Sequence, residues 1–438
     1  MIGIRAMTML GIVGALFTFT ARGQVPIVVG NNQQVGGVYI DTDGTVKMRQ
    51  TETTNELATQ RLRAKALAQP LKGQPITYIS IPRVLAEART LTEAGKEIPD
   101  DLKYLSGLTQ IRFVFVFPED HDIVIAGPSE PFDSSSKMSP VGKLTGRPVL
   151  HLDDLVTALR MASIADHRGR SEPFGCSIDP APDAFTKSSA VMRDHAGETR
   201  AARMAAMKSA IGPQRVSMFG APVDTRLAFV TLAADYKLKR ICLGMDSIPV
   251  PGVGSPIDNS RAAGNRFWFE ANYAPLLVSA DQDAYEIRGQ RLMLKVGALS
   301  FDEKGATETA KQFAKNFTAK FPQIATTVPL FADLQNVSDL ALVAHLIRHD
   351  KLAQRAGVDL GWCLSEKNYR VATLATPKSA ETIVNFASGS IVAGGVTLDL
   401  ADLVGGAKRE TDSKGDLKGG KVRPEGWSQT KGAEKPKG

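Results

Sequence analysis

The chain has 438 residues, of which 43% are hydrophobic and 23% are charged, and its formal net charge is +7. These proportions are typical of a globular protein. Much of the excess charge lies at the two ends: residues 405–438 hold nine basic and five acidic residues, and Arg5 and Arg22 lie near the start. Residues 24–404 hold 42 basic and 41 acidic residues. A body so close to neutral has no general attraction for polyanions, so nucleic-acid binding is not expected.

The first 23 residues predict export. Arg5 is the only charged residue among the first seven, and an apolar stretch, TMLGIVGALFTFT, follows at residues 8–20. This stretch is too short to span a bilayer, and Ala21 and Gly23 place small residues at the −3 and −1 positions of a cleavage site. The pattern predicts a signal peptide cleaved after Gly23 and a mature protein in the periplasm, the envelope or the medium.

Residues 24–146 predict an N-terminal region of mixed helices and strands. Residues 35–50 alternate in polarity around an Asp-Gly turn, and residues 111–126 contain two apolar runs around a charged tip. Both patterns predict β-hairpins. A stretch rich in Ser, Pro and Gly at residues 127–146 predicts a linker to the next region.

Residues 147–246 alternate short apolar runs with helical patterns. The runs predict strands at residues 149–152, 176–178 and 215–219, each followed by at least one helix. Strands that alternate with helices favour a partly parallel layer joined by crossover connections.

Residues 247–404 predict a third region, in which a meander of short strands at 267–301 precedes two helices. The last 34 residues, 405–438, contain eight glycines and few large apolar side chains. They are predicted to form a disordered basic tail, whose charge of +4 favours weak, salt-sensitive contact with an anionic envelope polymer or lipid. The whole chain is predicted to be a mixed α+β protein of unknown topology.

A five-residue phrase recurs at residues 37–41, 175–179 and 395–399. Each copy reads glycine, small apolar, polar, branched apolar, aspartate. The phrase predicts a strand that begins at a glycine and ends at an aspartate, which hydrogen-bonds its own turn. The alternative is a ligand-binding role for the three aspartates.

Cysteines and histidines do not form a complete metal site. Cys176, Cys242 and Cys363 lie far apart, which leaves open either one disulfide with a free thiol or no disulfide. His345 and His349 have the spacing of zinc ligands on a helix, but a leucine follows His345 where a zinc protease needs a glutamate. Two solvent-facing histidines near a helix end are therefore expected, with no metal. Since no nucleotide, dinucleotide or serine-hydrolase motif is complete, no cofactor is predicted.

The densest groupings of acids and histidines lie in two places. His121 stands in the charged tip of the second hairpin, and His151 lies just before Asp153 and Asp154. Acid–base catalysis needs a group that titrates near neutrality beside a carboxylate. These four residues are therefore the candidate catalytic residues, and turn solvation and helix capping are the alternative explanation for them.

The chain also resembles a known family. The stretches FVFPEDHDIVIAGP, GRPVLHLDDLVTALR and GCSIDP, followed by NRFWFEANYAPLLVS, VPLFADLQNVSDLALVAHLI and AGGVTLD, resemble uncharacterised secreted proteins of planctomycete bacteria. These are grouped as a domain of unknown function, number 1598. The resemblance implies export and a bacterial envelope setting, and it supplies no reaction, cofactor or catalytic residue.

The export signal, the neutral body and the incomplete catalytic motifs together predict a non-enzymatic binding or structural component of the cell envelope. The alternative is a secreted or periplasmic hydrolase with an unrecognised acid–base site. That alternative requires two of the candidate side chains within about 4 Å of each other in one pocket.

Overall fold

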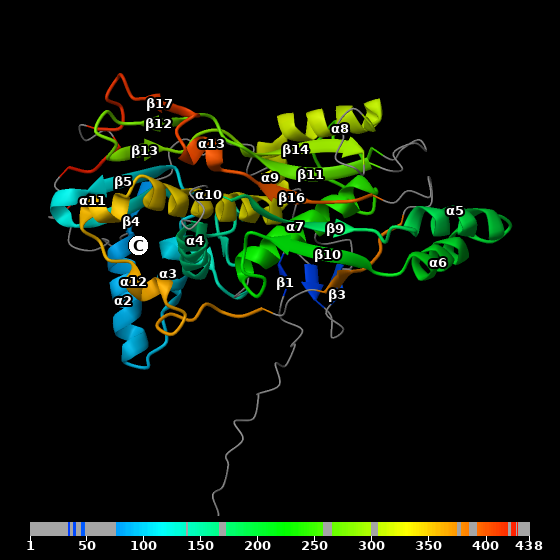
Figure 1. Cartoon of the computed structure of the whole chain (residues 1–438), viewed down its shortest axis with the longest axis horizontal. Helices are drawn as coiled ribbons and strands as arrows, with labels where there is room; N and C mark the ends of the chain where they lie inside the picture. Colours follow the sequence, from blue (N-terminus) through cyan, green and yellow to red (C-terminus); the bar gives the residue numbers. More distant parts are fainter. Residues whose placement is uncertain are drawn as a thin grey trace, which may run out of the picture.

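A computed structural model describes residues 34–35, 38–40, 45–48, 76–136, 139–165, 172–256, 265–298, 305–374, 378–384, 392–418, 422–425 and 427. The predicted signal peptide and the tip of the first hairpin, residues 41–44, lie outside these ranges. The described chain folds into two large mixed sheets with helices between and around them, which confirms the predicted α+β class (Figure 1).

The larger sheet has nine strands and lies on the right of Figure 1. The predicted hairpin at residues 35–50 is present, because β2 and β3 pair antiparallel. The strands, in sheet order, are β1 (Gln34–Val35), β2 (Val38–Ile40), β3 (Thr45–Met48), β15 (Ser379–Ala380), β10 (Gln214–Phe219), β9 (Phe174–Asp179), β16 (Val396–Leu398), β11 (Asn265–Asn272) and β14 (Arg291–Ala298).

The smaller sheet has six strands and contains the second predicted hairpin, β5 and β6. Its strands, in sheet order, are β17 (Arg409–Thr411), β12 (Leu276–Val278), β13 (Ala284–Glu286), β5 (Phe113–Phe117), β6 (Asp122–Pro128) and β4 (Ile76–Ser80). A short pair, β7 (Phe132–Asp133) and β8 (Val141–Gly142), stands apart. Each large sheet contains strands from before residue 147 and strands from after residue 247. The regions predicted from the sequence therefore share their sheets.

The four strands predicted as a meander are present but do not pair in series. β11 pairs with β14 along its full length, whereas β12 and β13 pair with each other and β13 continues onto β5. Pro275, which cannot donate a ladder hydrogen bond, lies between β11 and β12. The alternation identifies each strand, but it does not reveal that β13 pairs with β5, which lies more than 160 residues earlier in the chain.

The central region departs from its predicted parallel layer. β9 and β10 pair antiparallel, because α5 (Ala184–Asp194) and α6 (Arg200–Ile211) form a helical hairpin that returns the chain to the end of the sheet it left. Residues 149–151, predicted as part of a strand, form no named strand and lead directly into α4 (Leu152–Ala165).

Helix α10 (Pro329–His349) is the central element of the core, with α4 and α7 (Arg226–Cys242) packed against it (Figure 1). It is the one described helix long and apolar enough to cross a membrane, but that apolar stretch is wholly buried inside the protein, as in a core helix. The remaining helices are α2 (Ile81–Glu93), α3 (Asp100–Lys103), α8 (Glu308–Ala319), α9 (Phe321–Thr327), α11 (Leu352–Ala356), α12 (Gly361–Leu364) and α13 (Ala401–Val404), with 3-10 turns η1 (Leu105–Gly107) and η2 (Pro118–Asp120).

The expectation of two solvent-facing histidines on this helix is wrong for one of them. His345 is only 6% exposed, because neighbouring elements cover α10 on all sides. Burial lowers the pKa of His345 to about 4, so the imidazole is neutral in the folded protein near pH 7. His349, on the last turn, is exposed and its Nδ1 lies 2.7 Å from Asp350 Oδ1.

The prediction of disorder after Val404 is wrong for the described part of that segment. Arg409–Thr411 form β17, which extends the smaller sheet by pairing with β12. Leu417 and Trp427 are buried against Phe113, Phe115 and Phe117 on the outer face of β5. A few apolar side chains are enough to order this segment because they pack on an aromatic face of the sheet. The composition of the segment alone does not reveal that face.

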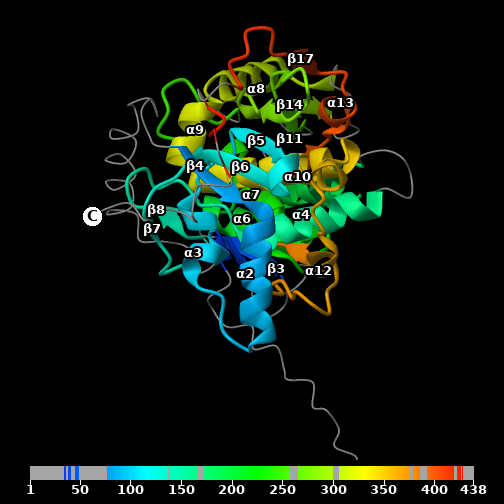
Figure 2. The ribbon, with the colours of Figure 1, turned by 90° about the vertical axis from the view of Figure 1, so that its left-hand side faces the viewer.

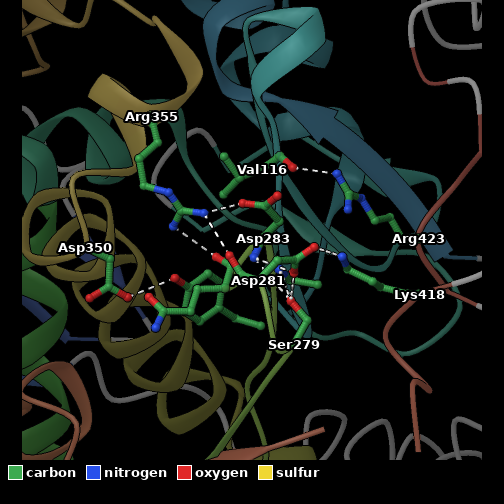
Figure 3. A network of polar contacts seen from close by, with 11 residues as sticks. Val116, Ser279, Asp281, Asp283, Asp350, Arg355, Lys418 and Arg423 are labelled. Atoms are coloured by element: carbon green, nitrogen blue, oxygen red, sulfur yellow. Dashed lines mark hydrogen bonds and ion pairs between the residues drawn. The ribbon is translucent and has the colours of Figure 1, made fainter.

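Polar contacts also hold this C-terminal segment in place. Lys418 forms an ion pair with Asp281, and Arg423 Nη2 donates to the Val116 carbonyl oxygen at 2.7 Å (Figure 3). Tyr78 donates its hydroxyl hydrogen to the Val422 carbonyl oxygen at 2.6 Å. Part of the positive charge predicted to reach toward outside polyanions is therefore directed at the protein's own sheet.

The recurring phrase marks three strands of the same sheet, namely β2, β9 and β16. Asp399 accepts a hydrogen bond from the Ala401 backbone nitrogen, so it binds its own turn as predicted. Asp179 instead pairs with Arg266 on β11, and Asp41 lies outside the described residues. The three cysteines are free and buried, which answers the question left open by their spacing.

Candidate functional site

A pocket of about 730 Å³ is lined in part by residues at the ends of α2 and α3. These two helices lie at one end of the molecule (Figure 2). The lining of the pocket comes from four stretches of chain that are far apart in sequence. These are residues 92–104, from the end of α2 to the end of α3, residues 151–153 at the start of α4, Arg226 at the start of α7, and residues 367–374. Two of the four predicted candidate residues, His151 and Asp153, line this pocket.

His151 forms part of the pocket floor. Its side chain is only 5% exposed, its ring packs edge-on against Tyr104 with centroids 5.1 Å apart, and its Nε2 has no hydrogen-bond partner. Burial, together with the positive charge of Arg226, lowers the pKa of His151 well below its usual value. The imidazole is therefore neutral, and its Nε2 is buried without a hydrogen-bond partner, which costs free energy.

Asp153 fixes one wall of the pocket. It lies in the first turn of α4, where a carboxylate is favoured by the positive end of the helix dipole. Its Oδ1 accepts from the Tyr369 hydroxyl at 2.8 Å, and its Oδ2 accepts from the Ala372 backbone nitrogen at 3.0 Å. Arg160 on the same helix donates to the Tyr369 carbonyl oxygen at 2.5 Å. The wall formed by residues 367–374 is thus held to α4 at two points.

Asp154 lies behind the pocket rather than in it. It forms a buried ion pair with Arg226, whose other terminal nitrogen lies 2.6 Å from Asp333 Oδ2. Burial raises the pKa of Asp154 to about 6 despite the opposing charge of Arg226, and burial also raises the pKa of Asp333. The two carboxylates hold the Arg226 guanidinium at the pocket, so Asp154 positions another residue.

His121, the fourth candidate, is not part of this site. It adopts a left-handed backbone conformation at the tip between β5 and β6, and its Nδ1 lies 3.0 Å from the Ala356 carbonyl oxygen at the end of α11. It acts as a cap for that helix. The acids beside it are not simply solvated either, because Asp122 is buried and accepts hydrogen bonds from Ser80 and Trp427.

The structure does not show the pairing that a hydrolase would need. No hydrogen bond joins His151 to Asp153 in the described chain, since Asp153 binds Tyr369 and Ala372 and His151 Nε2 binds nothing. The lining residues include no serine or cysteine, and the Thr92 hydroxyl donates to the Ala88 carbonyl oxygen within its own helix. No group of three metal-ligating side chains occurs among the described residues.

Sequence analysis did not identify Tyr104, Tyr369, Arg226 or Asp333 as parts of the site. One signal was present for Arg226, because it stands at the first position of a helix, where a cation opposes the helix dipole. Such a residue requires an acid nearby, and Asp154 and Asp333 supply two. Tyr369 carries no comparable signal, since its partner Asp153 is 216 residues away.

Comparison with known proteins finds one family model that matches part of the chain, and no reaction. A family model described as a protein of unknown function, DUF1598, matches residues 176–255. A DUF1598 domain of unknown function is found there. No curated protein and no solved structure matches the chain. The matched residues begin in β9 and include α7, so they supply Arg226 to the pocket, whereas His151, Asp153 and Tyr369 lie outside them.

The DUF1598 segment also contains a buried polar cluster. Lys239 Nζ donates to Gln214 Oε1 at 2.6 Å and to the Ile178 carbonyl oxygen at 3.0 Å. Burial lowers the pKa of Lys239 to about 8 and raises the pKa of nearby Asp235 to about 7. Cys176 donates to the Thr231 carbonyl oxygen at 3.6 Å, and burial raises its pKa well above the usual value, so the thiol stays protonated. This cluster ties α7 to β9 and β10.

Proposed function

We propose that the protein is an exported binding component of the bacterial cell envelope, without enzymatic activity, and that it takes its ligand into the pocket at His151. The observation that carries this proposal is a pocket of about 730 Å³ whose lining includes His151, a residue with an unpartnered ring nitrogen, and the carboxylate of Asp153. Pockets of this size are typical small-molecule sites. Export is supported by the signal-like first 23 residues and by the resemblance to secreted planctomycete proteins.

The state of the two candidate residues favours binding over catalysis. A histidine whose pKa lies well below its usual value is a weak base, and a carboxylate occupied by two hydrogen-bond donors is not free to orient it. Both residues are instead suited to accept or donate fixed hydrogen bonds to a bound molecule.

The binding function is tested by ligand capture. The mature chain is incubated with a soluble envelope extract and repurified, and the released small molecules are identified by mass spectrometry. We expect one ligand to be retained by the wild type and by the variant Ala205→Trp, whose exposed site lies on α6. Ala372→Trp should retain little, because Ala372 lines the pocket and the added indole fills it. Equal retention by all three proteins would refute the assignment of the pocket.

The hydrolase alternative is favoured by one observation, that His151 and Asp153 line the same pocket. The capture experiment separates the two functions, because a binding protein releases its ligand unchanged. Time-dependent conversion of the ligand by the wild type, lost in His151→Gln and Asp153→Asn, would establish the hydrolase instead.

A further inference from the structure

Positive charge is concentrated around the pocket. Five cationic side chains line it, and Asp153 is the only carboxylate among the lining residues. Lys96 and Lys103 come from the loop after α2 and from α3, whereas Lys367 and Arg370 come from the segment after α12. Two stretches of chain more than 260 residues apart thus each supply two cations to one cavity, although the body as a whole is nearly neutral.

Only part of this charge is compensated by the protein. Arg226 is held between Asp154 and Asp333, and Lys103 Nζ lies 2.7 Å from Glu97 Oε1. Lys96, Lys367 and Arg370 have no ion pair within the described part of the chain, and all three are exposed. The mouth of the pocket therefore carries three cations without an ion-pair partner in the described chain, and they favour an anionic group.

The floor of the pocket carries hydrogen-bonding groups in place of the cations at its mouth. It is formed by His151 and the carboxylate of Asp153, with Tyr104 and Tyr369 beside them, and the exposed Asn368 also lines the pocket. These groups can form hydrogen bonds with the hydroxyls of a ligand. The volume is also far larger than an inorganic anion requires.

We propose that the pocket binds an acidic saccharide, whose hydroxyl groups reach His151 and Asp153 on the floor and whose carboxylate, phosphate or sulfate lies against Lys96, Lys367 and Arg370 at the mouth. This inference rests on the proposed binding function and names its ligand class. The acidic group comes either from a single sugar or from a segment of an acidic polysaccharide, and the recognition chemistry is the same.

Binding is measured by isothermal titration calorimetry on the mature chain with four probes: galacturonate, trigalacturonate, maltotriose and inorganic phosphate. Trigalacturonate should bind at least about tenfold more tightly than neutral maltotriose and than phosphate alone. Weaker binding of galacturonate than of trigalacturonate indicates a polymer segment, and equal binding indicates one sugar unit. Equal affinity for maltotriose overturns the acidic ligand, and equal affinity for phosphate reduces the site to an inorganic anion site.

Charge-reversal variants locate the acidic group. Lys367→Glu with Arg370→Glu should weaken trigalacturonate binding by at least about tenfold. The affinity that remains should change less with salt concentration than that of the wild type. The matched control is Lys187→Glu with Arg193→Glu, which makes the same change of charge on exposed positions of α5 and should leave the affinity unchanged. Equal weakening by both pairs would show only a general charge effect. If the first pair fails to fold, the single change Arg370→Gln tests the same contact.

The floor is tested separately with His151→Leu, which removes the hydrogen bond and keeps an apolar side chain of similar size. It should weaken galacturonate and trigalacturonate by a similar factor, because the same hydroxyl contact is lost from both. Trigalacturonate could fail to bind although the wild type captures a ligand from the envelope extract that Ala372→Trp does not retain. In that case the saccharide class is wrong and the binding function stands. If no ligand is captured either, both proposals fail.

Discussion

Trp427 donates its indole nitrogen hydrogen to Asp122 Oδ2 at 2.7 Å, although 305 residues separate the two in sequence. Ser80 donates to the other oxygen of Asp122 at 2.7 Å. The indole also stacks on Phe117, with centroids 5.6 Å apart. One side chain near the end of the chain thus satisfies a buried carboxylate and covers an aromatic sheet face.

This contact makes the C-terminal segment part of the fold, with a measurable effect on stability. Trp427→Ala should lower the free energy of unfolding by about 2–4 kcal/mol, since it removes a buried aromatic ring and one of the hydrogen-bond donors to the buried Asp122. Chemical denaturation followed by circular dichroism measures this change. Lys414→Ala, at an exposed position of the same segment, is the matched control and should have little effect.

Truncation after Val404 extends the same test. It removes β17, Leu417 and Trp427, so the aromatic face of β5 becomes exposed to water. A truncated chain with the thermal midpoint of the full chain would contradict the observed packing. Lower stability with increased binding of a hydrophobic dye is the expected outcome.

The behaviour of this segment shows what local sequence can and cannot predict. The strands of the two hairpins and the start of α4 follow from alternation and capping, which depend on neighbouring residues. The placement of Trp427 depends on a face built by β5 and β6, about 300 residues earlier. A segment judged by its own composition appears too polar to fold, because its apolar partners lie elsewhere in the chain.

In the candidate site, too, only the residues that are close in sequence could be predicted to lie together. His151 and Asp153 are two positions apart at the start of one helix, and their closeness could be read from the sequence. Tyr369, which binds Asp153, and Asp333, which binds Arg226, come from distant segments. His121 shares the composition of a catalytic cluster, yet its ring meets only the end of α11 because β5 and β6 carry it to that helix.

The Arg226 ion-pair cluster should be strongly coupled. Arg226→Met leaves two buried carboxylates without their cation and should cost about 3–5 kcal/mol of unfolding free energy. Adding Asp154→Asn should recover part of that loss, because one of the uncompensated charges is gone. A double variant whose losses simply add would show that Arg226 and Asp154 do not interact. Arg240→Met, which breaks the more exposed pair with Asp246, should cost less.

His345 should make stability depend on pH. Its pKa is about 4 in the folded chain, compared with about 6.5 when exposed. The unfolded chain therefore takes up a proton first as the pH falls, so the contribution of His345 is fully present above about pH 6.5 and is lost progressively toward pH 4. The loss amounts to about 3 kcal/mol, from the difference between the two pKa values.

This pH effect is measured as a difference between the wild type and His345→Leu. Carboxylates such as Asp154 titrate in both proteins and cancel in the comparison. Between pH 6.5 and pH 4 the wild type should lose more unfolding free energy than the variant. Parallel curves across this interval would contradict the burial of a neutral imidazole in α10.

The last prediction concerns the glycine pair that precedes β16. A Cβ added to Gly394 would collide with Asp235 Oδ1 and come within 2.9 Å of Lys239 Cδ. Both side chains are buried in α7, so neither can move away into solvent. Gly394→Ala should therefore lower the unfolding free energy by about 1–3 kcal/mol through overpacking. Gly197→Ala is the matched control, because no atom lies within 4 Å of its added Cβ, and it should be neutral or slightly stabilising. Equal stability of the two variants would show that β16 does not press against the Asp235–Lys239 cluster as the structure places it.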